Sequence, residues 1–136
     1  VAWFTTVNET GHAFAAFSSD SGRSWGQPIP LDDAGSLGQV GIVLLDDGSA
    51  AATWVEFANQ QAQLKVRRVD ASGARSAATN VTPVGVRPTG VPRVARMGDE
   101  LLFAWTESAA PQGDATEGVL QMKTAAARVP RATAVR

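Results

Sequence analysis

The sequence of 136 residues contains no cysteine and no tyrosine, and its one histidine is His12. Without cysteine there is no disulfide, no thiol nucleophile and no thiolate metal ligand. The 12 basic and 13 acidic side chains give a formal net charge of −1, so the chain lacks the basic excess typical of nucleic-acid binders. No apolar run approaches the roughly 20 residues of a membrane helix. The predicted partners therefore include neither a nucleic acid nor a membrane.

Metal and cofactor sites are not predicted either. His12 alone would have to serve a catalytic triad or a histidine metal site, and Gly11-His12 indicates a turn entering a strand. The acidic pairs at 32–33 and 46–47 lack the ligand spacing of a calcium loop. No glycine-rich phosphate loop of the Walker or dinucleotide type occurs.

Tryptophan supplies the first positive signal, because Trp3, Trp54 and Trp105 stand 51 residues apart. Each of these tryptophans follows a similar short apolar segment. Trp54 and Trp105 are followed two residues later by Glu56 and Glu107. The same spacing carries further residues onto one another, among them Val43 onto Val94. A period of this length indicates a repeated structural unit.

Each unit is a series of short apolar runs separated by turns, so we predict strands and no helices. In the middle unit, Asp46-Asp47-Gly48 is typical of a hairpin between two such runs. The predicted strands are residues 1–7, 12–17 and 28–31, then 39–45, 50–57, 63–69 and 77–81, then 92–97, 100–107 and 118–124. Four strands in about 50 residues match one propeller blade.

The predicted fold is therefore all-β, a partial β-propeller of about three four-stranded blades. The predicted units are a partial blade over residues 1–35, a full blade over 36–86, a partial blade over 87–127 and a flexible tail over 128–136. A closed propeller needs 4–8 blades. The chain is thus a fragment of a longer protein, completes a ring with copies of itself, or folds as a sandwich.

One motif has a more specific pattern. Residues Ser18-Ser19-Asp20-Ser21-Gly22-Arg23-Ser24-Trp25 resemble the Asp-box, Ser-x-Asp-x-Gly-x-Ser/Thr-Trp, of the bacterial neuraminidase (BNR) repeats in sialidase-like propellers. We expect a structural turn between the third and fourth strands of a blade, with Asp20 accepting backbone hydrogen bonds and Gly22 left-handed. We expect the Trp25 ring to be buried beneath the hairpin. The equivalent box 51 residues later keeps only Gly73.

The resemblance implies a six-bladed glycoside hydrolase that is extracellular or at the cell surface, although the sequence itself contains no signal peptide. In that family three arginines bind the sialic acid carboxylate, a tyrosine paired with a glutamate is the nucleophile, and an aspartate is the acid/base. This chain has no tyrosine, so we predict no catalytic residue and a segment that is not catalytically complete by itself. The predicted function is glycan-directed, as part of a larger hydrolase-like protein; the alternative is a non-enzymatic structural or protein-binding module.

Four residues are candidates for binding a glycan. Arg93 and Arg87 supply guanidinium groups near an inner strand, and such groups bind carboxylates bidentately. Glu56 and Glu107 each share a strand face with a repeated tryptophan and would bind sugar hydroxyls. The alternative for the arginines is a solvated charge, and for the glutamates a structural cap beside a buried tryptophan. The predicted partners are a glycan and either the missing blades or further copies of the chain.

Overall fold

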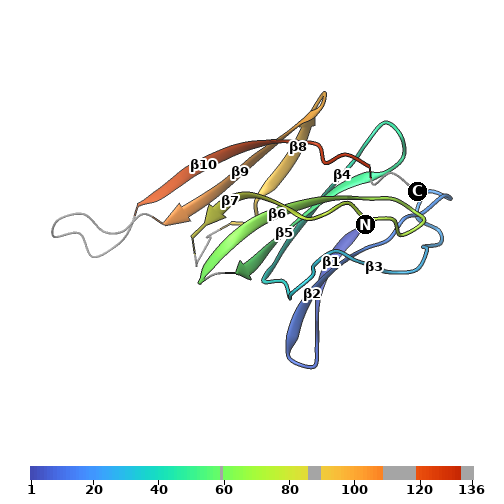
Figure 1. Cartoon of the computed structure of the whole chain (residues 1–136), viewed down its shortest axis with the longest axis horizontal. Coiled ribbons are helices and arrows are strands. Elements are labelled where there is room, and N and C mark those ends of the chain that lie inside the picture. The colour runs from blue at the N-terminus through green and yellow to red at the C-terminus, as the bar shows by residue number, and fades with distance from the viewer. Residues whose placement is uncertain (59, 86–89, 109–118, 133–136) are drawn as a thin grey trace.

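The structure is a computed structural model that describes residues 1–58, 60–85, 90–108 and 119–132. These residues form ten strands and no helix (Figure 1). The all-β prediction is therefore confirmed. No helix able to cross a membrane is found in the described part of the chain.

The strands form three antiparallel sheets, each made of strands that follow one another along the chain. The N-sheet contains β1 (Ala2–Val7), β2 (Thr10–Ala15) and β3 (Ile29–Pro30). The middle sheet contains β4 (Gly38–Leu44), β5 (Ala50–Ala58), β6 (Gln61–Val69) and β7 (Thr79–Val84). The C-sheet contains β8 (Arg93–Met97), β9 (Glu100–Ser108) and β10 (Leu120–Arg128).

The hairpin between β4 and β5 forms where the sequence predicts it. Gly48 has a φ of +81°, a conformation that glycine adopts without a steric cost. The Asp47 carboxylate accepts hydrogen bonds from the backbone N–H and the hydroxyl of Ser49, at 3.1 and 2.6 Å. These hydrogen bonds lie within the turn itself.

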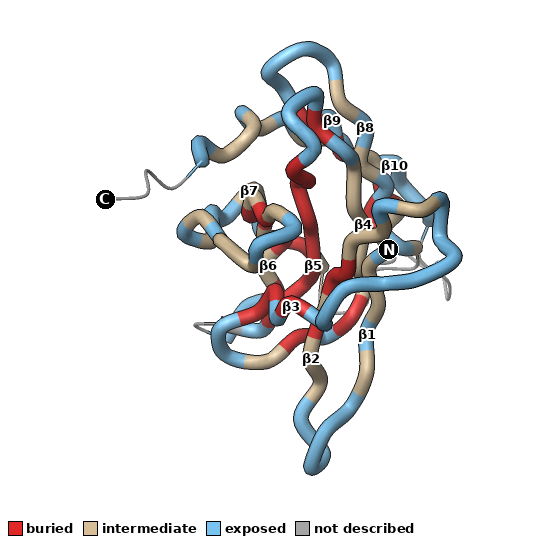
Figure 2. The backbone as a smooth tube through the Cα atoms, turned by 90° about the vertical axis from the view of Figure 1, so that its right-hand side faces the viewer, coloured by how far each residue is buried: buried red, intermediate tan, exposed pale blue. Residues whose placement is uncertain are grey.

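The middle sheet lies between the other two, and its central strand β5 is buried on both faces (Figure 2). Alternate β5 residues pack on opposite sides, as the period of two requires. Ala50, Ala52 and Trp54 belong to the cluster shared with the N-sheet, which includes Ala13, Ala15, Ile29 and Leu31. Ala51 and Val55 belong to the cluster shared with the C-sheet, which includes Leu101, Phe103 and Trp105.

The bounds of several strands differ from the sequence prediction; the strand predicted at 118–124, for example, is β10 at Leu120–Arg128. The register of the repeated unit differs as well. Val43 pairs with Ala51, whereas Ala95 pairs with Leu102, so the predicted equivalence of Val43 and Val94 is wrong by one residue. The cause is the β8–β9 hairpin, which is one residue shorter than the β4–β5 hairpin.

The chain after β10 is also held by hydrogen bonds where the sequence predicted a flexible tail. The Val129 N–H donates to the Asp99 carbonyl at 2.9 Å, and the Pro130 carbonyl accepts from Arg68 at 3.4 Å. Residues 133–136 of the predicted tail lie outside the described residues.

The contact between β4 and β8 yields a test of the sheet stacking. A β-carbon on Gly41 would lie 2.7 Å from Thr53 Oγ1 and 3.3 Å from Val94 Cγ1. We expect Gly41→Ala to lower the free energy of unfolding by about 1–3 kcal/mol, because the Thr53 side chain in the same sheet and Val94 in the neighbouring sheet would both have to shift. Urea denaturation measures this change.

Gly26→Ala is the matched control, because the nearest atom to a β-carbon at Gly26 is 3.5 Å away. Its stability should be close to that of the unmodified protein. Equal stability of the two alanine variants would contradict the close approach of β4 and β8.

Candidate functional site

The Asp20 turn connects β2 to β3, and its carboxylate is saturated with hydrogen bonds. Oδ1 accepts from the Ser18 hydroxyl and the Ser24 backbone N–H, both at 2.8 Å, and Oδ2 accepts from the Ser24 hydroxyl at 2.6 Å. Gly22 has a φ of +84°, and its N–H donates to Ser18 Oγ at 2.7 Å. These hydrogen bonds, with those from Ser24 the largest cause, lower the pKa of Asp20 to about 2. A carboxylate engaged in this way shapes a turn and is poorly suited to proton transfer near neutral pH.

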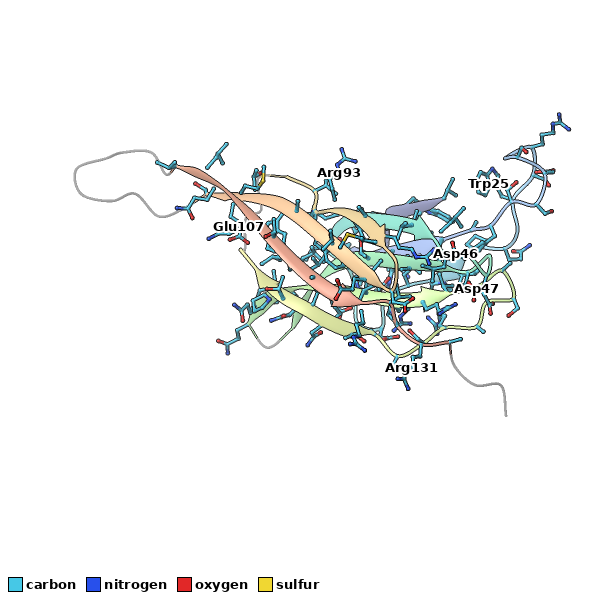
Figure 3. The ribbon with its side chains drawn as sticks, turned by 90° about the horizontal axis from the view of Figure 1, so that it is seen from above. Trp25, Asp46, Asp47, Arg93, Glu107 and Arg131 are labelled. Atoms are coloured by element: carbon cyan, nitrogen blue, oxygen red, sulfur yellow. The ribbon has the colours of Figure 1, made fainter. Side chains whose placement is uncertain are left out.

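The Trp25 ring is not buried, contrary to the prediction. It is 47% exposed, and its indole N–H makes no hydrogen bond with a described residue. The ring borders a shallow apolar groove with Phe17, Ile42 and Leu44. The ring stays exposed because the hydrogen bonds of the turn are local and bring no other strand over Trp25. Figure 3 shows Trp25 at the opposite end of the molecule from Glu107.

A second turn of the same type joins β6 to β7, where the repeat spacing retains only Gly73. Asp70 Oδ1 accepts from the Ser72 N–H at 2.9 Å, the Ser72 hydroxyl at 2.6 Å and the Ala74 N–H at 3.1 Å. Gly73 has a φ of +88°. The hydrogen bond from the Ser72 hydroxyl is the largest cause that lowers the pKa of Asp70. The sequence comparison missed this aspartate because it stands one residue earlier than the fixed spacing requires.

The two repeated tryptophan–glutamate pairs are hydrogen-bonded within each pair. The Trp54 indole N–H donates to Glu56 Oε2 at 3.0 Å, and that of Trp105 donates to Glu107 Oε1 at 2.7 Å. The prediction that each glutamate shares a strand face with its tryptophan is therefore confirmed. Both carboxylates also bond to other groups inside the protein, and this limits what else they can bind.

Glu56 is buried, with 2% of the residue exposed, and its Oε1 accepts from Lys65 Nζ at 2.6 Å. Glu107 Oε1 accepts a further hydrogen bond from the Gly85 N–H at 2.9 Å, which ties the C-sheet to the chain just after β7. The hydrogen bond from Trp105 is the main cause that lowers the pKa of Glu107. The contacts support the structural alternative for both glutamates.

A lysine faces each of these tryptophans, which the sequence analysis did not detect. Lys65 pairs with Trp54, and Lys123 pairs with Trp105. The two lysines are 58 residues apart, because the connection between β9 and β10 is longer than that between β5 and β6. A search at the fixed period of the tryptophans therefore cannot align them.

Arg93 is placed differently from the glutamates. It is exposed at the start of β8 and pairs with Ala104, whose side chain faces away from the middle sheet. It borders a groove of about 600 Å³ on the outer face of the C-sheet, lined also by Ala95, Leu102, Thr124 and Ala126. Among the described residues its guanidinium forms no hydrogen bond or ion pair. Arg93 is the one predicted glycan-binding residue that the described structure leaves available.

The predicted glycan-binding residues do not converge. Glu56 lies in the interface between the N-sheet and the middle sheet, and Glu107 lies in the interface between the middle sheet and the C-sheet. Arg93 lies on the far side of the C-sheet, apart from Glu107 (Figure 3). Arg87 lies outside the described residues. No group of three or more metal-binding side chains occurs within the described ranges.

Two further pairs, each with one buried partner, hold the loop between β3 and β4. His12 Nδ1 lies 3.0 Å from Asp32 Oδ2, and Asp32 Oδ1 accepts from the Ala13 N–H at 2.6 Å. Arg67, which is 3% exposed, forms an ion pair with Asp33, and its guanidinium carbon lies 5.4 Å from the Trp54 ring centroid. These contacts join elements far apart in sequence, and no local pattern indicates them.

The Glu56–Lys65 pair provides a test of the structural role. Glu56→Gln leaves the Lys65 ammonium without its charged partner, and Lys65 is only 15% exposed in its side chain. We expect the free energy of unfolding to fall by about 3 kcal/mol, because breaking one side of a buried ion pair leaves an uncompensated charge. Adding Lys65→Met should recover part of this loss.

Glu100→Gln is the control, since Glu100 is exposed. Urea denaturation of the variants measures the differences. If Glu56→Gln and Glu100→Gln have the same stability, the structural role of Glu56 is wrong.

The lowered pKa of Asp20 predicts a specific acid response. The pKa of Asp20 is lower in the folded protein than the ordinary value of 3.8. The ionised form of Asp20 therefore stabilises the fold above about pH 4. That contribution is lost as the pH falls toward 2. Asp20→Asn should lower stability at neutral pH and weaken the pH dependence in this window, as measured by denaturation at a series of pH values. A carboxyl NMR titration of Asp20 with its midpoint at the ordinary value would contradict this.

Comparisons of the chain with protein-family models, curated proteins and solved structures find no match. The function is therefore inferred from the chain's own residues and contacts.

Proposed function

We propose that the chain is a segment of a sialidase-like propeller, in which the three sheets are successive blades. Three observations support this. The sheets are antiparallel and follow one another in sequence, and they pack face to face. The Ser18–Trp25 turn connects the last two strands of its sheet, with Asp20 at its centre, which is the place and role expected for an Asp-box.

Within that arrangement, we propose that this segment is a scaffold and holds no complete catalytic centre. The observation that carries this is the engagement of Glu56 and Glu107, whose carboxylates are hydrogen-bonded to tryptophan and to further donors at the sheet interfaces. A glycosidase needs carboxyl groups positioned on either side of a scissile bond. Two carboxylates in different interfaces do not meet that need.

A glycan-directed role is then one of binding, and Arg93 is the residue that favours it. The exposed guanidinium has no partner among the described residues and stands beside an apolar groove. A carboxylate-bearing sugar could pair with the guanidinium while its apolar face packs on Ala95 and Leu102. The alternative, a structural or protein-binding module without glycan affinity, is favoured by the two engaged glutamates.

Two assays distinguish a hydrolase, a glycan-binding module and a scaffold without glycan affinity. We expect no turnover of a fluorogenic sialoside, and measurable binding of a sialylated oligosaccharide by calorimetry. Arg93→Ala should weaken that binding about tenfold, the loss expected for a charge-assisted hydrogen bond. Arg131→Ala is the control, because Arg131 is also exposed and lies on the opposite side of the molecule (Figure 3).

Each remaining outcome is informative. Turnover by the chain alone would overturn the scaffold proposal. No binding by the unmodified protein, or equal binding by the two arginine variants, would overturn the glycan role of Arg93 and leave the protein-binding alternative.

A further inference from the structure

The two outer sheets each leave one face uncovered in the described structure. On the C-sheet, Leu102, Leu120 and Met122 are 40%, 61% and 76% exposed, and all three lie on the face turned away from the middle sheet. On the N-sheet, Trp3 stacks on Phe14 with ring centroids 5.7 Å apart, on the face opposite Ala13 and Ala15, and both rings are half-buried. We call these the C-face and the Trp3 face. They lie at opposite ends of the stack (Figures 1 and 2).

The interfaces inside the chain follow one rule. Trp54 faces the N-sheet, the sheet that precedes its own, and Trp105 faces the middle sheet, which again precedes its own. The tryptophan face of each sheet thus packs on the non-tryptophan face of the sheet before it. Trp3 belongs to a tryptophan face and the C-face is a non-tryptophan face, and no other sheet of the described structure packs on either of them. The Trp3 face and the C-face are therefore complementary: a Trp3 face packed on a C-face would repeat the contact that joins the sheets inside the chain.

Equivalent residues support this pairing. Because Lys65 pairs with Trp54 and Lys123 pairs with Trp105, the neighbours of the two lysines correspond. Leu64 corresponds to Met122, and Ala62 to Leu120. Leu64 and Ala62 are completely buried by the C-sheet cluster, whereas their counterparts on the C-face are exposed. The same strand positions are therefore apolar whether or not a sheet covers them.

Arg93 determines what kind of sheet fits the C-face. The register places Arg93 at the position of Gly41, since Gly41 pairs with Thr53 and Arg93 pairs with Ala104. Gly41 has no side chain because β8, the first strand of the next sheet, approaches it closely. A sheet with its own first strand would collide with Arg93. Among the described residues the N-sheet contains no strand of this kind: β1 carries Trp3 and so corresponds to β5, the second strand of the middle sheet.

We infer that the C-face binds the Trp3 face of a second copy of this chain, head to tail. The inference rests on the proposed succession of like sheets. Each copy uses two different faces, so the interface is heterologous and leads to a closed ring or a longer array. Apolar area removed from water supplies the attraction, and Arg93 occupies the space left by the absent first strand.

Sedimentation equilibrium over a range of concentrations tests the association. We expect the weight-average mass of the unmodified chain to rise at least about twofold above the 14.2 kDa of one copy. Met122→Glu on the C-face and Thr5→Lys on the Trp3 face should each remain monomeric. Leu37→Glu is the control, because Leu37 is 52% exposed, lies in the loop between β3 and β4 and belongs to neither face, and it should associate normally.

Mixing the two blocked variants is the decisive step. Met122→Glu keeps an intact Trp3 face and Thr5→Lys keeps an intact C-face, so an equimolar mixture should form a dimer and nothing larger. This dimer would also show that both variants are folded. An unmodified chain that is monomeric throughout, association of either blocked variant alone, or no dimer in the mixture would overturn the inference. A second copy on the C-face would cover the groove beside Arg93, so the glycan test is run on Thr5→Lys, which keeps an intact C-face and should remain monomeric. The two tests then have separate readouts, and failure of one proposal does not imply failure of the other.

Discussion

The structure depends on the burial of β5 between two other sheets. A strand that is covered on both faces carries mainly apolar or internally paired side chains, and β5 does so with alanines, Trp54 and the bonded Glu56. The exception is Thr53, whose buried hydroxyl has no hydrogen-bond partner in the described structure. The small alanines allow close packing on both sides, while Trp54, at the middle of the strand, fills the space against the N-sheet. The N-sheet and the C-sheet are held in place because this one strand supplies a surface to each.

Burial at these interfaces also explains why the carboxylates are poor candidates for chemistry. A charged group removed from water needs partners, and Glu56 obtains them from Trp54 and Lys65. Glu107 obtains them from Trp105 and from the backbone after β7. The hydrogen bonds that offset the cost of burying these two carboxylates also point them toward the interior of the protein. In contrast, Arg93 is exposed on a surface where an outside molecule can reach it.

Local rules predicted the features that short stretches of chain control. The hairpin at 46–48 follows from Asp-Gly chemistry, and the shared face of each tryptophan and glutamate follows from the alternation of side chains along a strand. The Asp20 turn is equally local, since all its hydrogen bonds lie within residues 18–24. Missing from the prediction were Lys65 and Asp70, because insertions of different length shift each element from the common period.

The sequence by itself determined the all-β class, the order of the short strands and the geometry of their turns, because each of these depends on neighbours a few residues away. Only the tertiary structure decided which faces are covered. It buries Glu56, leaves Trp25 half exposed, and sends Arg93 and Glu107 to different layers. Exposure depends on which distant segment packs over a side chain, and no pattern of adjacent residues encodes that choice.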